Sequence, residues 1–159
     1  MVILTLITVG TLKENYLKDA VSEYKKRLLQ YARVDEINIK EEQVHNEDDS
    51  SEITRALNIE GDKIIAAIPK DSAVVALCVE GKELDSISLA EKIAEMQNEK
   101  GKITLIIGSS HGLAPIVKAR ADFRLSVSKL TFPHQLMRPV LLEAVYRSFT
   151  IIAGKKYHK

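Results

Sequence analysis

The sequence predicts an α/β fold in which a parallel sheet carries helices on both faces. Five short apolar segments alternate with segments of helical periodicity along the 159 residues, of which 45% are hydrophobic. The strand segments are almost continuously apolar, which is typical of strands buried on both faces. We expect a single domain over residues 1–159, because this length is enough for one core and short for two. The expected strands are Val2–Val9, 34–39, 73–79, Lys102–Ile107 and Phe123–Ser126.

The segments between these strands have the apolar spacing of amphipathic helices. In the first of them, Leu17, Val21, Tyr24 and Leu28 recur every three or four residues, with Lys and Glu on the other side. The acidic stretch 41–52 has no such period, so we predict a mobile loop there. The expected helices are 13–31, 51–68, 86–98, 113–119 and one after Pro133.

The last helix is apolar around most of its circumference between residues 136 and 152. Such a helix must be covered on more than one side. In so short a chain we predict that the second cover is another copy, which makes a homodimer. Pro139 lacks an N–H, and its ring crowds the carbonyl of Gln135. The helix is therefore expected either to start late, near Leu136, or to kink.

Composition excludes several classes of protein. No apolar run approaches the roughly 18 residues of a membrane span, and no basic segment precedes the first apolar residues as in a signal peptide. The single cysteine, Cys78, excludes a disulfide within the chain. We therefore expect a cytoplasmic protein without a membrane partner.

The formal net charge of +1 hides an asymmetry between the two parts of the chain. Residues 111–159 carry nine Lys or Arg and two acidic residues, a net of +7, which leaves 14 bases and 20 acids, a net of −6, in residues 1–110. A chain polarised in this way is able to present a basic face to a polyanion such as RNA. The alternative is that these bases are simply solvated, and charge alone does not decide between the two.

A turn of small residues, 108–112, follows the fourth apolar strand. It matches the G-x-S-x-G pattern of hydrolases, but the chain is short for that fold and has no preceding oxyanion segment. Glycines needed only for a tight turn are one alternative, and close approach of the backbone to a ligand is the favoured one. The sequence contains neither a Walker A loop nor G-x-G-x-x-G, which disfavours P-loop and dinucleotide-binding folds. A second strand-to-helix joint lies at 127–133, and ligands of α/β sheets bind at such joints.

Two polar segments near the C-terminus have both an ordinary and a functional interpretation. Pro133 suits a helix entry, where its missing donor costs nothing, and His134 beside it is either a capping residue or a catalyst. The tail 154–159 contains a tyrosine and a histidine between lysines. It is either a disordered end or a segment that orders against a nucleotide.

Six motifs together decide between these alternatives. TVGTLKE, LCVEGKEL, IIGSSHGL, LSVSKLTFPHQLMR, EAVYRSF and the terminal YHK resemble the RlmH family of SPOUT methyltransferases over the whole chain. The resemblance implies a parallel α/β sheet with a C-terminal deep trefoil knot and a homodimer packed through the last helix. It also implies S-adenosylmethionine as methyl donor. The implied reaction is methylation at N3 of a pseudouridine in large-subunit (23S) rRNA within assembled ribosomes.

The resemblance also implies which residues contact the methyl donor. Many relatives have Gly-Gly after the fourth strand, whereas this chain has Ser109 at the second position. The implied cofactor-binding residues are Leu77, Gly108, Val127, Ser128, Lys129, Leu130, Thr131 and Phe132.

The implied reaction is an in-line displacement at a sulfonium methyl group by an imide nitrogen, which must lose its proton. The candidate catalytic residues are His134, Arg138, Tyr157 and His158, and none is singled out as the base. No cluster of Cys or His suggests a metal, and the reaction requires none. Two rival functions remain: a knotted tRNA methyltransferase, and a non-catalytic nucleotide-binding or ribosome-associated module.

Overall fold

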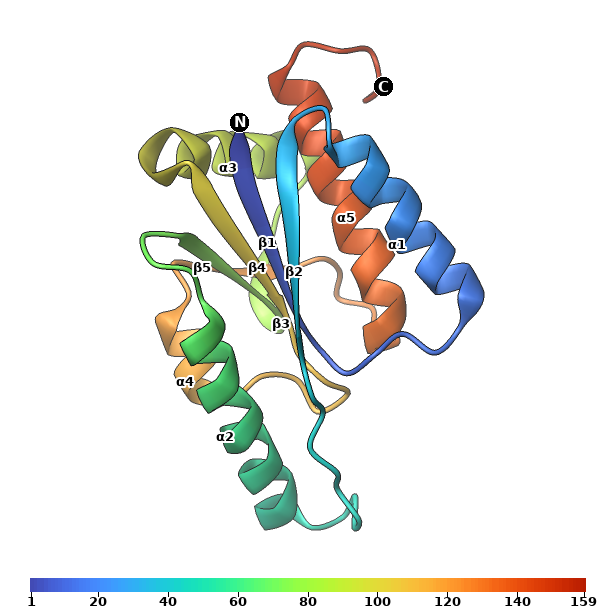
Figure 1. The fold of residues 1–159 in the computed structure, drawn as a ribbon, viewed down its shortest axis with the longest axis vertical. Coiled ribbons are helices and arrows are strands. Elements are labelled where there is room, and N and C mark those ends of the chain that lie inside the picture. Colours follow the sequence, from blue (N-terminus) through green and yellow to red (C-terminus); the bar gives the residue numbers. More distant parts are fainter.

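A computed structural model describes all residues, 1–159, and its sheet has five strands in the order β2-β1-β4-β3-β5, every neighbouring pair parallel (Figure 1). The predicted α/β class and parallel sheet are confirmed. The strands are β1 (Val2–Val9), β2 (Ala32–Ile39), β3 (Ala73–Glu83), β4 (Lys102–Ile107) and β5 (Phe123–Ser126). The helices are α1 (Asn15–Leu28), α2 (Ser50–Ala67), α3 (Ser86–Lys100), α4 (Pro115–Arg120) and α5 (His134–Ile152).

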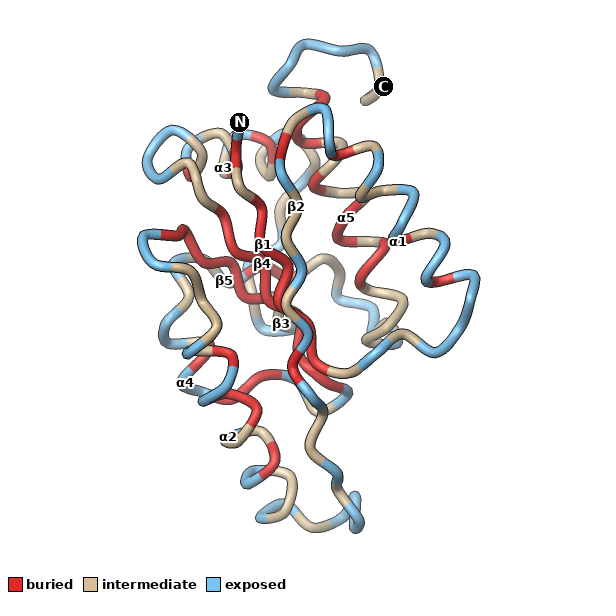
Figure 2. Tube along the Cα trace, in the orientation of Figure 1, coloured by how far each residue is buried: buried red, intermediate tan, exposed pale blue.

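The continuous apolar character of the strands arises because helices cover both faces of the sheet. Successive residues of β1 point to opposite sides, so Leu6 belongs to one core cluster and Ile7 to the other. The larger core of 18 buried residues lies under α1, α3 and α5, and the smaller one of 10 lies under α2 and α4. The sheet runs as a buried layer between them (Figure 2).

Strand β3 extends to Glu83, four residues beyond the predicted end, because its pairing with β5 is interrupted. Leu77 and Lys82 are both opposite Leu125, so the residues between them bulge out of the ladder. Gly81 lies so close to β5 that a Cβ there would be 2.6 Å from the carbonyl carbon of Leu125. An irregularity of this kind leaves no periodic signal in the sequence.

The other boundaries differ by a few residues from those predicted, for reasons of local capping. Asp49 caps α2 by accepting hydrogen bonds from the backbone N–H of Ser51 and Glu52, so this helix includes the end of the predicted loop 41–52. Gly101, at φ +65°, ends α3 in the left-handed conformation. Helix α1 is shorter than the predicted 13–31, and α4 starts at Pro115.

Helix α5 packs between α1 and α3 of the same chain. Its residues Leu141, Val145 and Phe149 are each at most 3% exposed. Much of the apolar circumference that suggested a partner is therefore covered within one subunit. The helix also begins at His134, earlier than the predicted start near Leu136, and continues through Pro139. The structure contains no helix that is both long and apolar enough to cross a membrane.

Candidate functional site

A cavity of about 440 Å³ lies at the carboxyl ends of β4 and β5, beside the bulged residues 77–80 of β3. Three segments form its walls: 77–80, 107–113 and 126–134, with Lys118 and Met137 completing the lining. Parallel strands end at the same edge of a sheet, and the loops after them form the usual ligand site of open α/β folds. A volume of this size suits a small organic ligand.

The loop after β4 is folded back on itself by glycine. A Cβ at Gly108 would lie 2.2 Å from the carbonyl oxygen of Gly112, so no larger residue fits in this conformation. The backbone N–H of Gly112 donates to the Ser109 carbonyl at 2.9 Å, and Gly112 itself has φ +88°. The folded-back shape of this loop therefore requires glycine at position 108, independently of any ligand. Ser110, the serine of the hydrolase-like pattern, is exposed and makes no hydrogen bond to a histidine.

The segment after β5 offers free backbone groups to the cavity. No residue from 127 to 132 makes a backbone-to-backbone hydrogen bond. Side chains hold its shape instead: the Ser126 hydroxyl donates to the Ser128 carbonyl at 3.1 Å, and the Ser128 hydroxyl accepts from the Leu130 N–H at 3.0 Å. The Leu130 side chain lines the cavity although it is 75% exposed. Unpaired amides and carbonyls beside an apolar side chain are able to bind the edge and face of a heterocycle.

Two acidic residues attach the segment 40–49 to the loop after β4. The Glu47 carboxylate lies 2.5 Å from the ring Nε2 of His111, which lines the cavity. Glu60 on α2 is 3% exposed and accepts a hydrogen bond from the Glu42 N–H at 2.9 Å. Burial raises the pKa of Glu60, while its hydrogen bonds to the Glu42 N–H and the Ser109 hydroxyl lower it. The acidic stretch predicted to be only a loop therefore contacts the cavity wall.

His134 is the predicted catalytic residue that lines the cavity. Burial lowers the pKa of its imidazole, and the positive charges of Arg138 and Lys13 act in the same direction, against the Glu41 carboxylate. A depressed pKa leaves His134 neutral at pH 7. In that form one ring nitrogen is free to accept a proton.

Arg138 lies one helical turn after His134 but outside this cavity. Its Nη2 donates to the carbonyl oxygens of Val9 at 3.0 Å and Gly10 at 2.6 Å, which connects α5 to the end of β1. Of the donor contacts implied by the resemblance, Lys129 also lies outside the lining. The other seven line the cavity: Leu77, Gly108, Val127, Ser128, Leu130, Thr131 and Phe132.

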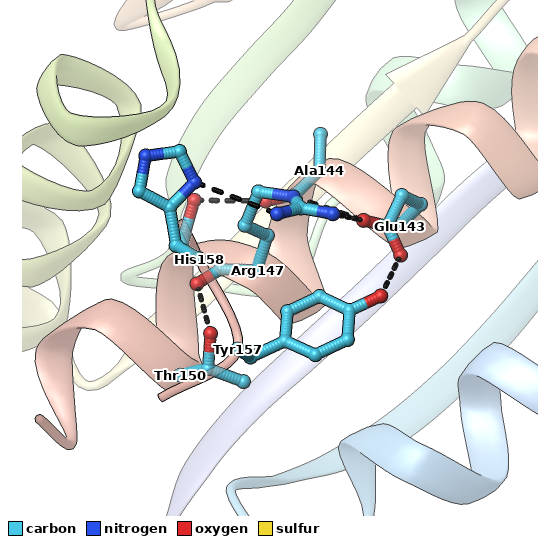
Figure 3. A network of polar contacts seen from close by, with 7 residues as sticks. Glu143, Ala144, Arg147, Thr150, Tyr157 and His158 are labelled. Atoms are coloured by element: carbon cyan, nitrogen blue, oxygen red, sulfur yellow. Dashed lines mark hydrogen bonds and ion pairs between the residues drawn. The ribbon is translucent and has the colours of Figure 1, made fainter. Parts of the chain in front are cut away.

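Tyr157 and His158 follow the C-terminal end of α5, and the tail folds back toward the middle of the helix. They form a cluster with two residues of the helix, Glu143 and Arg147 (Figure 3). The Tyr157 hydroxyl donates to Glu143 at 3.0 Å, Arg147 binds the same carboxylate at 2.6 Å, and His158 Nδ1 lies 3.4 Å from Arg147 Nη1. Burial raises the pKa of Tyr157, so its hydroxyl is protonated at neutral pH. Glu143 lies nine residues, or roughly 14 Å, along α5 from His134, and neither Tyr157 nor His158 lines the cavity of its own subunit.

Glu143 and Arg147 were not among the predicted site residues. Their spacing of four residues within EAVYRSF is the signal that would have found them, because it places an acid and a base on one helix face. The part of the wall formed by Cys78, Val79 and Glu80 was not predicted either. No three metal-binding side chains are grouped anywhere in the structure.

The fold and this cavity define a class, and comparison with known proteins identifies it. A family model described as SPOUT methyltransferase matches residues 2–158. The chain belongs to this family. Within it, the ribosomal RNA large subunit methyltransferase H of Bifidobacterium adolescentis is 47% identical over 158 residues, and that of Shouchella clausii 45% over 157 residues; each alignment covers 98% of this chain and 99% of the relative. The resemblance to the RlmH family is thereby confirmed.

Solved structures agree on the fold at much lower sequence identity. A methylase family protein from Haemophilus influenzae superimposes with a TM-score of 0.58 and 15% identity, covering 98% of this chain and 70% of its own. A structure described in terms of 2-OH methylation of C/U34 on tRNA gives a TM-score of 0.52 at 15% identity, covering 97% and 99%. At this sequence identity, both structures show a shared fold and nothing more.

The depressed pKa of His134 predicts how stability depends on pH. Because the folded-state pKa lies below the unfolded value, the neutral ring contributes stability above about pH 6.5, which is lost as the pH falls through the folded pKa. His134→Asn should therefore flatten the fall in unfolding free energy between pH 7.5 and 5.5. Urea unfolding measures this effect. An NMR titration of the His134 ring with a midpoint at or above 6.5 would contradict it.

Proposed function

We propose that this protein transfers a methyl group from S-adenosylmethionine to N3 of a pseudouridine in large-subunit (23S) rRNA, and that it acts on assembled ribosomes. Relatives with 45–47% identity over nearly their whole length are named ribosomal RNA large subunit methyltransferases H. One structural observation carries the assignment to this site. Seven of the eight residues expected to contact the donor converge on a single cavity at the strand ends. Action on ribosomes would place the protein in the cytoplasm.

The cavity has the size and chemistry that the donor requires. Its volume of about 440 Å³ accommodates a nucleoside with an amino-acid arm. The unpaired backbone groups of 127–132 suit the adenine edge, and the Leu77 and Leu130 side chains suit its faces. When bound, the donor supplies an electrophilic methyl group on a sulfonium.

The protein's own contribution to the reaction is positioning and proton removal. An imide nitrogen attacks only after its proton leaves, and a neutral imidazole at the cavity wall is able to take it. His134 has that position and that charge state. Tyr157 keeps its proton at neutral pH, so its proposed part is to donate a hydrogen bond. Arg138 would contribute positive charge, and His158 would contribute orientation.

The proposal includes a homodimer in which the tail of one subunit completes the site of the other. Within one chain, neither Tyr157 nor His158 lines the cavity, and the residues that hold them, Glu143 and Arg147, lie nine and thirteen residues along α5 from His134. Residues that act together in one reaction must meet, so a tail that takes part must come from the partner. The proposal also includes the deep trefoil knot of the family. In support, residues 127–133 pass against residues 77–80 of β3 and the loop 107–113 on their way from β5 to α5.

Neither rival function has a specific observation in its favour. The tRNA-methylating structure shares 15% identity with this chain, and that likeness concerns the fold alone. A non-catalytic nucleotide-binding module would not need a neutral, half-buried imidazole at the cavity wall.

The reaction is tested by mass mapping of rRNA from a strain that lacks the gene. One large-subunit pseudouridine should lose a mass of one methyl group, and the gene supplied in trans should restore it. Purified protein and labelled S-adenosylmethionine should methylate ribosomes from the deletion strain and not those from the parent. An unchanged rRNA map in the deletion strain would refute the assignment.

Donor binding is expected to depend on Leu130, whose exposed side chain lines the cavity. Removing its methyl groups takes apolar contact from the adenine, so Leu130→Ala should weaken S-adenosylmethionine binding about tenfold, or about 1.4 kcal/mol. Ile116→Ala is the matched control, because Ile116 is also an exposed apolar residue and lies outside the cavity. Equal affinities of the two variants in calorimetry would show that the donor binds elsewhere.

Mixing of two inactive variants tests the shared site. Thr131→Trp adds bulk at the exposed rim of the cavity, and deletion of 157–159 removes the tail. Heterodimers purified through two different tags should recover activity, because one of their two sites has an intact cavity and an intact partner tail. Random mixing should restore about a quarter of the wild-type sites. If heterodimers stay inactive while each variant still dimerises in sedimentation, the tail does not act across subunits.

A further inference from the structure

A second pocket, of about 560 Å³, lies between α1, the ends of β1 and β2, and α5. We call it the Arg138 pocket, because that side chain forms its floor. Most of its lining residues are polar or charged, unlike those of the donor cavity. The methyl-transfer reaction proposed above assigns no ligand to this pocket.

The Arg138 guanidinium is an incompletely satisfied buried charge. The residue is 6% exposed, and its two hydrogen bonds, to the Val9 and Gly10 carbonyls, both use Nη2. Its Nε is buried without any partner, and Nη1 makes no hydrogen bond within the protein. No carboxylate forms an ion pair with it. A buried cation without a counter-ion is costly, and guanidinium groups bind phosphate and carboxylate in a two-pronged geometry.

The remaining charges of the pocket favour an anion. Lys18 on α1 is exposed at the rim and takes part in no ion pair. Lys25 forms an ion pair at 2.8 Å with Glu36, the one acidic residue of the lining, so that this carboxylate is already neutralised. Neither Arg138 nor Lys18 forms an ion pair, and the carboxylates of Glu36 and Glu41 act on Arg138 only from beyond ion-pair distance. The hydroxyl groups of Thr11 and Ser22 add hydrogen-bond donors.

The Arg138 pocket is close to the donor cavity. His134 lines one and Arg138 the other, and residues four apart on a helix have Cβ atoms about 5–6 Å from each other. A nucleotide strand that delivers a base to the first pocket would carry its backbone phosphates past the second. We propose that the Arg138 pocket binds a backbone phosphate of the RNA whose base is methylated. This inference rests on the proposed function for its choice of RNA as the source of the phosphate.

Phosphate binding is tested first without any reaction. Inorganic phosphate titrated into the full chain should shift the NMR signals of Lys18, Asn38 and the Arg138 side chain, and leave those of Leu130 unchanged. A uridine pentanucleotide should shift the same signals at a lower concentration. Lys18→Gln should weaken both effects severalfold. Lys26→Gln is the matched control, because Lys26 is an exposed lysine of α1 outside the pocket, and it should leave both effects unchanged.

The second measurement is methyl transfer to ribosomes. Lys18→Gln should raise the KM for ribosomes five- to tenfold, with the affinity for S-adenosylmethionine and the melting temperature unchanged. No phosphate-induced shift at the pocket would overturn the inference. Binding of phosphate without binding of the oligonucleotide would overturn the assignment to RNA, leaving a small free phosphate as the ligand. If ribosomes are not methylated at all, the proposed function fails, and the two titrations still decide what the pocket binds.

Discussion

Burial of the central strands on both faces is the constraint on which the rest of the structure depends. β1, β4 and β3 lie between two helical layers, so their side chains are apolar in both directions. Polar chemistry is then confined to the edge where the strands end. The turn at Gly108 is the direct consequence, because the chain leaving β4 has to fold back within five residues, against the carbonyl of Gly112.

Helix α5 connects the functional parts of the molecule. Its first turn supplies His134 to the donor cavity, its second supplies Arg138 to the end of β1, and its third and fourth turns hold the cluster around Glu143 and Arg147. Its middle is buried between α1 and α3, which makes it a rigid spacer between these groups. The same rigidity separates the tail from the cavity in one chain, and it is the physical reason for proposing a shared site.

Burial influences the protonation states of these site residues more than ion pairing does. Desolvation is the largest influence on the pKa of His134, Glu60 and Tyr157, and it disfavours the charged form of each. A neutral imidazole and a protonated phenol are therefore available at pH 7 in different parts of the protein. Arg138 stays charged in spite of its burial, because a guanidinium does not lose its proton near neutral pH. A buried group that cannot lose its charge therefore indicates a missing binding partner more clearly than a group that becomes neutral.

The sequence by itself determined the α/β class, the parallel sheet, the family and the two joints that form the cavity. These follow from local patterns: continuous apolar strands, helical periodicity, and short motifs at fixed positions. Only the tertiary structure decided which predicted residues meet. It placed His134 in the cavity, Arg138 at a second pocket, and Tyr157 and His158 against Glu143 and Arg147 of α5. It also showed that α1 and α3 cover much of α5, and that the 41–52 segment contacts the cavity through Glu47. Such contacts join residues up to 129 positions apart, and no local pattern encodes a distance between segments that are separated so far in the chain.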